Sequence, residues 1–312
     1  MTPFAPGSST SAPDLARLLE RTSRTFALAI PALPEPTRRE VTIAYLLFRI
    51  ADTFEDASHW PVAHRLAALA DFQRRLVDPL PGEAARTAAA WVSAVPSHHP
   101  GYAQLVAETP GVLEAFRALG PGSVGPIRDH VVRSAHGMAE FVARTEGTEL
   151  ALRSLEELRR YCYVVAGLVG EMLTELFVLG REALSREVPF LRERAATFGE
   201  ALQLVNILKD EGADAAEGRR YLPPTVPRSD LFGLARRDLL VAADYIGALQ
   251  RAGAPSGIVE FTALPVELAW ASLERIEARG PGSKVSRLDV VRITRRVRLA
   301  LDQGRPAVAP RP

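Results

Sequence analysis

Apolar residues recur at helical spacing through almost the whole of this 312-residue chain, and alternating strand patterns are scarce. The repeat is clear in Val41, Ala44, Tyr45 and Phe48, and clusters of Pro and Gly separate the periodic segments. Asp14 is the predicted amino-terminal cap of the first helix. Hydrophobic residues make up 47% of the chain, enough for a substantial core, and no change in composition marks a second domain. The sequence therefore predicts an all-α, single-domain fold.

The predicted helical domain covers residues 14–302. Residues 1–13 and 303–312 are rich in Pro and small residues, and we expect both to be disordered tails. The first of them lacks the basic region and apolar stretch of a secretory signal. The most apolar segment, residues 161–180, contains Glu171 and Glu175, whereas a membrane-spanning helix needs about 20 nearly uncharged residues. The sequence therefore predicts no transmembrane anchor and at most a peripheral membrane contact.

Charge and cysteine content narrow the class of protein further. The formal net charge is +1, which provides no strong positive field for nucleic acid. The single cysteine, Cys162, excludes an internal disulfide, and His98 and His99 lack the companion ligands of a zinc site. We expect a cytoplasmic monomer without a nucleic acid partner, whose membrane contact, where it has one, is peripheral at the inner membrane.

One predicted helix, from about residue 37 to residue 57, carries a polar stripe where a core face would be apolar. Tyr45, Arg49, Asp52 and Asp56 follow at steps of four, three and four residues, which places them on one side of the helix with Glu55 beside them. Acidic residues in such a pattern usually form a solvated face. Here the surrounding residues are almost all apolar, which indicates burial on every side, and a buried polar stripe requires a partner.

A second predicted helix repeats this pattern far along the chain. Gln203, Asn206, Asp210 and Asp214 lie at steps of three, four and four residues, again among apolar neighbours. Two like charges about 4 Å apart cost about 4 kcal/mol at an effective dielectric of about 20, so facing carboxylates need a cation. Hard oxygen ligands select Mg²⁺ or Ca²⁺, the loop pattern of an EF-hand is absent, and Mg²⁺ takes one or two carboxylates plus substrate phosphates. The two acidic stretches therefore predict the halves of a magnesium diphosphate site.

The segment between the two acidic helices contains two glycines, Gly167 and Gly170, close to Tyr161. Each Gly inside a helix costs about 1 kcal/mol relative to Ala, so something must approach the backbone closely or bend it there. Tight helix packing and the apolar wall of a ligand cavity are about equally good explanations.

Arginines close to these segments are candidate phosphate ligands, because a guanidinium forks onto phosphate oxygens. Arg24, Arg49 and Arg219 lie beside or within them. Gly218 ends the second acidic helix and directs Arg219 back towards the helix end, where the arginine binds phosphate or pairs with Asp214.

Together these segments resemble the squalene and phytoene synthase family, and the resemblance runs from Ser23 to Leu301. Four motifs in the same order carry it, and the four together are far more specific than any one of them. They span Ser23 to Phe26, Tyr45 to Asp56, Tyr161 to Gly170 and Gln203 to Pro223.

The resemblance implies the all-helical isoprenoid-synthase fold with a central active-site cavity, Mg²⁺ as a cofactor and two prenyl diphosphates as substrates. It implies catalytic roles for Asp52 and Asp210, and for Tyr161 as a base or cation stabiliser that faces the reacting carbons. The implied metal ligands are Asp52, Glu55, Asp56, Asn206, Asp210 and Asp214. The implied substrate-binding residues are Arg24, Tyr45, Arg49, Gln203, Lys209 and Arg219.

The spelling of the motifs favours squalene as the product. Asp52-Thr-Phe-Glu-Asp56, Phe261-Thr-Ala-Leu-Pro265 and Lys284-Val-Ser-Arg287 all resemble squalene synthases, whose corresponding basic segment is tied to NADPH. Farnesyl diphosphate is then the expected substrate. The expected cofactor contacts are Asn206, Lys284 and Arg287.

Lys209 departs from the family, which commonly has Arg directly before the metal-binding Asp. The positive charge is kept, but the guanidinium fork is lost, and the expected phosphate contact of this residue rests on charge alone.

The sequence leaves two other functions open. A phytoene or dehydrosqualene synthase makes the same kind of head-to-head condensation without the reductive step. A non-catalytic isoprenoid-binding or assembly paralogue keeps the fold and loses the metal chemistry. Retention of both acidic stretches and of Tyr161 argues against this last function.

Overall fold

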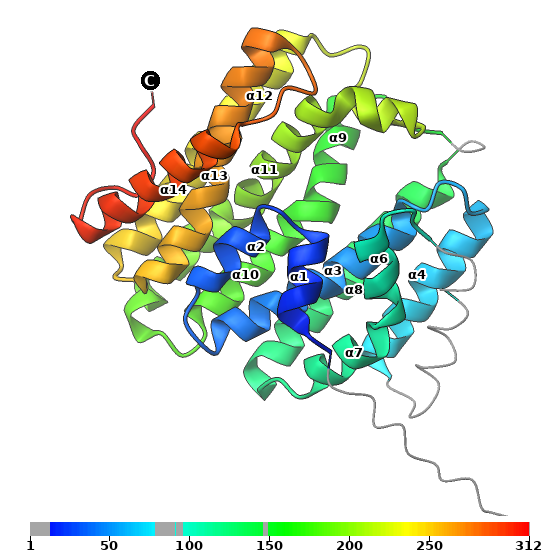
Figure 1. The fold of residues 1–312 in the computed structure, drawn as a ribbon, viewed down its shortest axis with the longest axis horizontal. Coiled ribbons are helices and arrows are strands. Elements are labelled where there is room, and N and C mark those ends of the chain that lie inside the picture. The colour runs from blue at the N-terminus through cyan, green and yellow to red at the C-terminus, as the bar shows by residue number, and fades with distance from the viewer. Residues whose placement is uncertain (1–12, 79–90, 92–95, 146–148, 312) are drawn as a thin grey trace, which may run out of the picture.

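The structure is a computed structural model that describes residues 13–78, 91, 96–145 and 149–311. Helices dominate it (Figure 1), which confirms the predicted all-α class. The only strands among these residues are β1 (Leu150–Ala151) and β2 (Arg219–Arg220), which pair in parallel. The helices are α1 (Leu15–Thr22), α2 (Phe26–Ala29), η1 (Ile30–Ala32), α3 (Thr37–Glu55), α4 (Val62–Val77), α6 (Pro100–Ala107), α7 (Thr109–Arg117), α8 (Pro121–Ala143), α9 (Leu155–Cys162), η2 (Tyr163–Gly167), α10 (Leu168–Val178), η3 (Glu182–Glu187), α11 (Val188–Ala216), α12 (Arg228–Arg251), α13 (Ser256–Arg279) and α14 (Arg287–Asp302).

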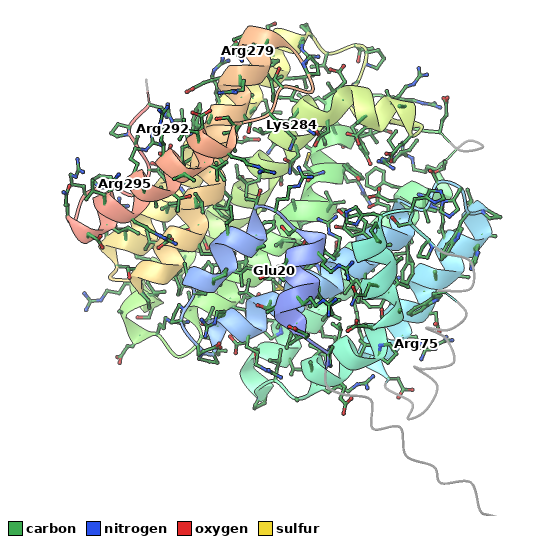
Figure 2. All side chains as sticks on the ribbon, in the orientation of Figure 1. Glu20, Arg75, Arg279, Lys284, Arg292 and Arg295 are labelled. Carbon is green, nitrogen blue, oxygen red and sulfur yellow. The ribbon has the colours of Figure 1, made fainter. Side chains whose placement is uncertain are left out.

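The long helix α11 organises the packing, because α10, α12 and α13 all lie against it. On the other side of the molecule, α3 packs on α8, and α8 in turn packs on α4. Side chains fill the spaces between these helices (Figure 2) and form one continuous core. Fully buried aromatic side chains from several helices contribute to it, including Phe54, Phe72, Phe141, Phe177 and Tyr245.

Local signals in the sequence explain where several helices begin. The Asp14 carboxylate accepts a hydrogen bond from the Arg17 backbone N–H at 3.0 Å, which confirms its predicted role as the cap of α1. Ser154 caps α9 and Ser286 caps α14 in the same way. The first acidic helix ends at Glu55, two residues before the predicted limit.

Glycines bring α10 and the preceding turn into backbone contact with α11. A Cβ atom on Gly170 would lie 1.9 Å from the carbonyl oxygen of Ala195, and one on Gly199 would lie 1.9 Å from that of Ala166. The five residues Tyr163–Gly167 form a π-helix, a form that widens the turn locally. Tight packing thus accounts for the glycines of this segment, and Gly170 in addition lines a cavity described below.

The helical stretch Leu155–Val178 is the one segment among the described residues whose length and composition would suit a membrane span. An 18-residue window within it has a mean hydropathy of 1.5, and 61% of that window is buried inside the fold. The stretch comprises α9, η2 and α10, which pack against α8 and α11. A buried core helix also has the length and composition of a membrane span.

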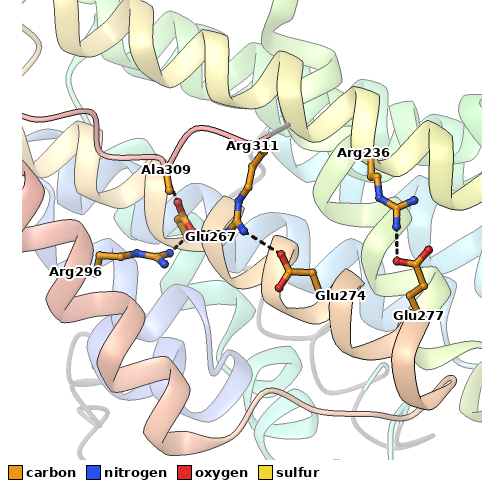
Figure 3. A network of polar contacts seen from close by, with 7 residues as sticks. All are labelled: Arg236, Glu267, Glu274, Glu277, Arg296, Ala309 and Arg311. Atoms are coloured by element: carbon orange, nitrogen blue, oxygen red, sulfur yellow. Dashed lines mark hydrogen bonds and ion pairs between the residues drawn. The ribbon is translucent and has the colours of Figure 1, made fainter.

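The carboxyl-terminal residues differ from the disordered tail that was expected for 303–312. Ala307 and Val308 are buried, and the Ala309 backbone N–H donates a hydrogen bond to the Glu267 carboxylate at 2.7 Å. The Arg311 guanidinium donates to Glu267 at 3.2 Å and to Glu274 at 2.9 Å (Figure 3). The chain orders here because Glu267 is buried in α13 and needs these donors. Residues 1–12 of the expected amino-terminal tail lie outside the described residues.

We expect Gly199→Ala to lower the free energy of unfolding by about 3 kcal/mol or more, because its methyl group would overlap the Ala166 carbonyl and the backbone cannot yield. Gly212→Ala, in the same helix with nothing within 4 Å of the added Cβ, should instead raise it by up to about 1 kcal/mol. Urea unfolding followed by circular dichroism measures both. Equal stability of the two variants would contradict the packing described for α10 and α11.

Candidate active site

A cavity lies between α2, α3, α10, α11 and α13, and its chemistry differs from one end to the other. Its polar end is formed by Tyr45, Arg49 and Asp52 of α3 and by Gln203 and Asn206 of α11. The first residues of the two polar stripes predicted on distant helices therefore meet at one cavity, whereas Asp56, Asp210 and Asp214 are not among its lining residues. The rest of the wall is mainly apolar and includes Phe26, Ile30, Val41, Phe48, Val165, Val169, Met172, Leu173, Phe198, Leu202, Phe261 and Pro265.

Asp52 is held at the polar end by Arg49, with 3.3 Å between the carboxylate oxygen and the guanidinium nitrogen. The guanidinium lies over the rings of Tyr45 and Tyr102, 5.7 and 5.4 Å from their centroids. The Tyr45 hydroxyl donates to the Thr22 carbonyl at 2.8 Å and so fixes its ring. Burial raises the pKa of Asp52 to about 6, although Arg49 acts in the opposite direction. The Asp52 carboxylate is therefore short of positive charge.

Glu55 lines a second, smaller crevice next to Arg65 and Tyr221 instead of the main cavity. Its side chain is buried, and one carboxylate oxygen has no hydrogen-bond partner within the described part of the chain. Burial raises the pKa of Glu55, and the nearby charges of Asp56 and Asp52 raise it further. A buried oxygen without a donor is costly, so this carboxylate is suited to accept a cation or a proton.

Tyr161 is packed beside this crevice with only 3% of its surface exposed. Its hydroxyl donates a hydrogen bond to the Tyr221 hydroxyl at 2.9 Å, and the two rings stack with centroids 4.5 Å apart. Burial, helped by the Glu55 charge, raises the pKa of Tyr161 well above its usual value. Among the described residues, those that line the main cavity do not include Tyr161. Its expected contact with reacting carbons stays a prediction.

Arg219 joins the ends of the two acidic helices. Its guanidinium nitrogens lie 3.5 Å from a carboxylate oxygen of Asp56 in the first stretch and 3.5 Å from one of Asp214 in the second. A third carboxylate, that of Glu217, lies 2.6 Å away. Gly218, with φ +77°, reverses the chain after α11 so that Arg219 turns back to the helix end, as the sequence predicted. The contact with α3 was not predicted.

The second acidic stretch, with Asp210 and Asp214, has too few basic residues of its own to neutralise its carboxylates. Burial raises the pKa of Asp214 to about 6, with Arg219 acting against it and Asp210 adding to it. Asp210 is more exposed and lies 3.2 Å from the ammonium group of Lys209. That ammonium group also donates a hydrogen bond to the Asn206 side-chain oxygen at 2.9 Å. Lys209 therefore lies directly against the Asn206 and Asp210 pair.

Within the described residues, no three or more His, Cys, Asp and Glu side chains gather closely enough to hold a metal ion by themselves. The donors nevertheless suit Mg²⁺, because they are hard oxygens with raised pKa values at Asp52 and Asp214 and an unpartnered oxygen at Glu55. Mg²⁺ usually takes one or two carboxylates and completes its octahedron with water and phosphate oxygens. The two groups of acids fit ions shared between protein and diphosphate better than an ion caged by protein alone.

Five of the predicted binding residues lie away from the cavity lining, namely Arg24, Lys209, Arg219, Lys284 and Arg287, and so do the predicted metal ligands Glu55, Asp56, Asp210 and Asp214. Arg24 is exposed in the turn between α1 and α2, and Lys284 and Arg287 are exposed at the beginning of α14. The loop before α14 is nevertheless tied to the acidic helix, because the Gly282 backbone N–H donates to the Lys209 carbonyl at 2.7 Å. This contact places the basic loop beside the residue that precedes Asp210.

Three residues of the site were not predicted from the sequence. Tyr102 covers Arg49, Tyr221 stacks on Tyr161, and Arg65 of α4 is buried and donates to the Glu55 backbone carbonyl. Tyr221 could have been proposed from the sequence, because it lies two residues after the predicted binding residue Arg219. No sequence pattern marks Tyr102 or Arg65, because only the fold brings α6 and α4 against α3.

Curated relatives of this chain are squalene synthases. The Botryococcus squalene synthase of Botryococcus braunii is 32% identical over 203 residues, which is 64% of this chain and 39% of the relative. The squalene synthase of Schizosaccharomyces pombe is 30% identical over 211 residues, which is 66% of this chain and 43% of the relative. The chain spans less than half of the length of each of these two relatives.

Solved structures extend the similarity to nearly the whole chain. A ligand complex of TcSQS matches with a TM-score of 0.70 and 25% identity, over 93% of this chain and 88% of that one. A dehydrosqualene synthase has the same fold, with a TM-score of 0.60 and 20% identity over 93% of this chain and 95% of that one. The family model for squalene/phytoene synthases matches residues 19–240, well over half of the chain. The protein therefore belongs to the squalene/phytoene synthase family.

Proposed function

We propose that this protein is a squalene synthase that joins two farnesyl diphosphates head to head and reduces the resulting presqualene diphosphate to squalene. The observation that carries the proposal is a cavity with an apolar wall and a polar part formed by Arg49 and Asp52 of α3 and Asn206 of α11. Beyond the cavity lining, Arg219 joins the acids at the ends of the same two helices, Asp56 and Asp214. An allylic diphosphate has the same division into an apolar chain and a charged head. The squalene synthases among the relatives support this choice of product.

The charged end is proposed to bind diphosphate with the help of Mg²⁺. When bound, Mg²⁺ neutralises the charge that develops on the leaving diphosphate. Arg49, Lys209 and Arg219 bind the phosphate oxygens, and each already lies against a carboxylate that a metal ion would share. The proposed metal ligands are Asp52, Glu55, Asp56, Asn206, Asp210 and Asp214.

The apolar wall is proposed to protect the carbocation that forms when diphosphate leaves. Water in contact with that cation would end the reaction as an alcohol, so the cavity must exclude it. The rings of Phe26 and Phe261, whose centroids lie 6.3 Å apart, offer faces that stabilise a cation. Tyr161 keeps its proton at neutral pH, which favours a role as a hydrogen-bond donor together with Tyr221.

The reductive step is proposed to use NADPH, which supplies a hydride when bound. The candidate residues are Lys284 and Arg287, exposed basic side chains on either side of the start of α14. The link from Gly282 to the Lys209 carbonyl supports their assignment, because it holds this loop near the charged end of the cavity.

The first test is the product. Purified protein with farnesyl diphosphate and Mg²⁺ should form squalene when NADPH is present and accumulate presqualene diphosphate or unreduced hydrocarbon without it. Mass spectrometry of the extracted products measures both, and geranylgeranyl diphosphate serves as the comparison substrate. A polyene formed in equal amount with and without NADPH would identify a phytoene or dehydrosqualene synthase. Unaltered substrate in every reaction would favour a non-catalytic paralogue.

A second test addresses the acidic stretches. We expect Asp52→Asn and Asp210→Asn each to lower turnover by at least about 100-fold, because each removes a charge from the diphosphate end while leaving a side chain of the same shape. Circular dichroism should show unchanged helix content. Asp244→Asn, an exposed acid on α12 away from the main cavity, is the matched control and should keep normal turnover. Normal turnover in either of the first two variants would refute the metal assignment.

A third test measures Mg²⁺ binding without turnover. The pKa of Asp52 and of Asp214 is about 6 in the folded protein, against an ordinary value of 3.8. Between these values the folded state binds more protons than the unfolded state, so without Mg²⁺ both groups lower the free energy of unfolding as the pH rises. Mg²⁺ binds the ionised carboxylates and should therefore raise the unfolding temperature at about pH 7.5 and have little effect at about pH 5.

The control for this measurement is the double variant Asp52→Asn and Asp214→Asn, which should lose the Mg²⁺-dependent rise. A rise of equal size at both pH values, or one that persists in the double variant, would show that Mg²⁺ binds elsewhere.

A further inference from the structure

Helix α14 presents a stripe of apolar residues to solvent. Leu288 is 58% exposed, Val291 63% and Leu299 46%, and all three lie on the side of α14 away from its buried residues Ile293 and Val297. Each exposes a large apolar side chain that the fold leaves uncovered. Single exposed leucines are ordinary, but three on one face of one helix indicate a surface that meets an apolar partner.

The same face is basic, with Arg292 and Arg295 on it and one exposed acid, Asp302. Helix α14 contains five arginines and two aspartates. Arg292 and Arg295 are exposed (Figure 2), and helical spacing places them on the same side of α14 as the exposed apolar residues. Arg295 has no ion pair with any described residue, and the nearest acid to Arg292 is Asp289 at 3.9 Å. Arg279 and Lys284, near the start of α14, are likewise exposed and unpaired within the described ranges. This local charge contrasts with a net charge of only +1 for the whole chain.

Arginines interleaved with exposed apolar residues along one helix match the surface of an anionic lipid bilayer, where the side chains enter the headgroup region and the guanidinium groups meet lipid phosphates. A protein partner or a second copy would have to place acidic residues opposite Arg292 and Arg295, whereas an anionic bilayer supplies phosphates along its whole surface. We propose that the outer face of α14, defined by Leu288, Val291, Arg292, Arg295 and Leu299, binds anionic membranes as an interfacial helix lying parallel to the surface.

Helix α14 packs against the rest of the protein through residues other than those of its outer face. The inner residues Ile293, Val297 and Ala300 are buried in the contact with α13. Arg296 and Arg298 point back to Glu267 and Glu260 of α13 and are ion-paired there. The exposed residues therefore add nothing to this packing, and their replacement should leave the protein folded. The inference concerns binding alone and does not rest on the proposed catalytic function.

Co-sedimentation of the full chain with phosphatidylcholine vesicles, with and without phosphatidylglycerol, tests the proposal. The protein should bind the anionic vesicles, and high salt should release it. Removing both charges in Arg292→Gln/Arg295→Gln should weaken binding about 25-fold, because one arginine near an anionic surface is worth about fivefold. The triple variant Leu288→Ser/Val291→Ser/Leu299→Ser should lose binding to a similar or greater extent.

The matched control is Arg237→Gln/Leu240→Ser on α12, which changes an exposed arginine and a leucine that is 38% exposed. It should bind vesicles as the unaltered protein does. The proposal is overturned if the unaltered protein binds no anionic vesicles, or if the α14 variants bind as well as it does. A triple variant that turns a dimer into a monomer, with vesicle binding unaffected, would assign the face to a second copy instead.

Discussion

The ion pairs of Arg219 with Asp56 and Asp214 set the conditions for the rest of the site. They join two helix ends that repel each other, because the last turn of a helix carries partial negative charge and both α3 and α11 place acids there without a basic residue. Burial raises the pKa of Asp214, and one guanidinium shared among three carboxylates does not offset this. A chain selected only for stability would place lysine or arginine at these ends. The arrangement becomes favourable when further cations bind between the helices.

The width of the cavity depends on a different contact, the backbone approach of α10 to α11. Gly170 lets α10 touch the Ala195 carbonyl of α11, and Gly199 lets α11 touch the Ala166 carbonyl of η2, the turn before α10. Side chains on either side of this contact, such as Val169 and Leu202, form the cavity wall. Since backbone atoms meet there, the two walls cannot move closer or slide without breaking the contact. The apolar part of the cavity is therefore shaped by rigid helices, whereas its polar part is formed by the side chains of Tyr45, Arg49, Asp52, Gln203 and Asn206.

The sequence allowed the helices and the two polar stripes to be predicted because both depend on residues three and four apart in one segment. The Asp14 cap and the end of α11 at Gly218 are equally local signals. The partner of Gly170 could not be predicted, because Ala195 lies 25 residues later and only the fold brings it near. Arg65 and Tyr102 were missed for the same reason. Glu55 and Asp56 were expected with Asp52, but both lie at the very end of α3, where they line a second crevice that other segments complete.

The ordered carboxyl-terminal segment shows how α13 connects the cavity to the outer surface. Glu267 is fully buried, and its carboxylate is held by Arg296 of α14 and by Arg311 and the Ala309 backbone of the last residues (Figure 3). Two residues earlier, Pro265 lines the cavity. A buried carboxylate with donors on two separate segments resists movement, because breaking either contact leaves charge unpaired in the core. The cavity wall and the basic outer face of α14 are thus fixed to the same helix, so a surface bound at α14 would hold the cavity in a defined orientation to it.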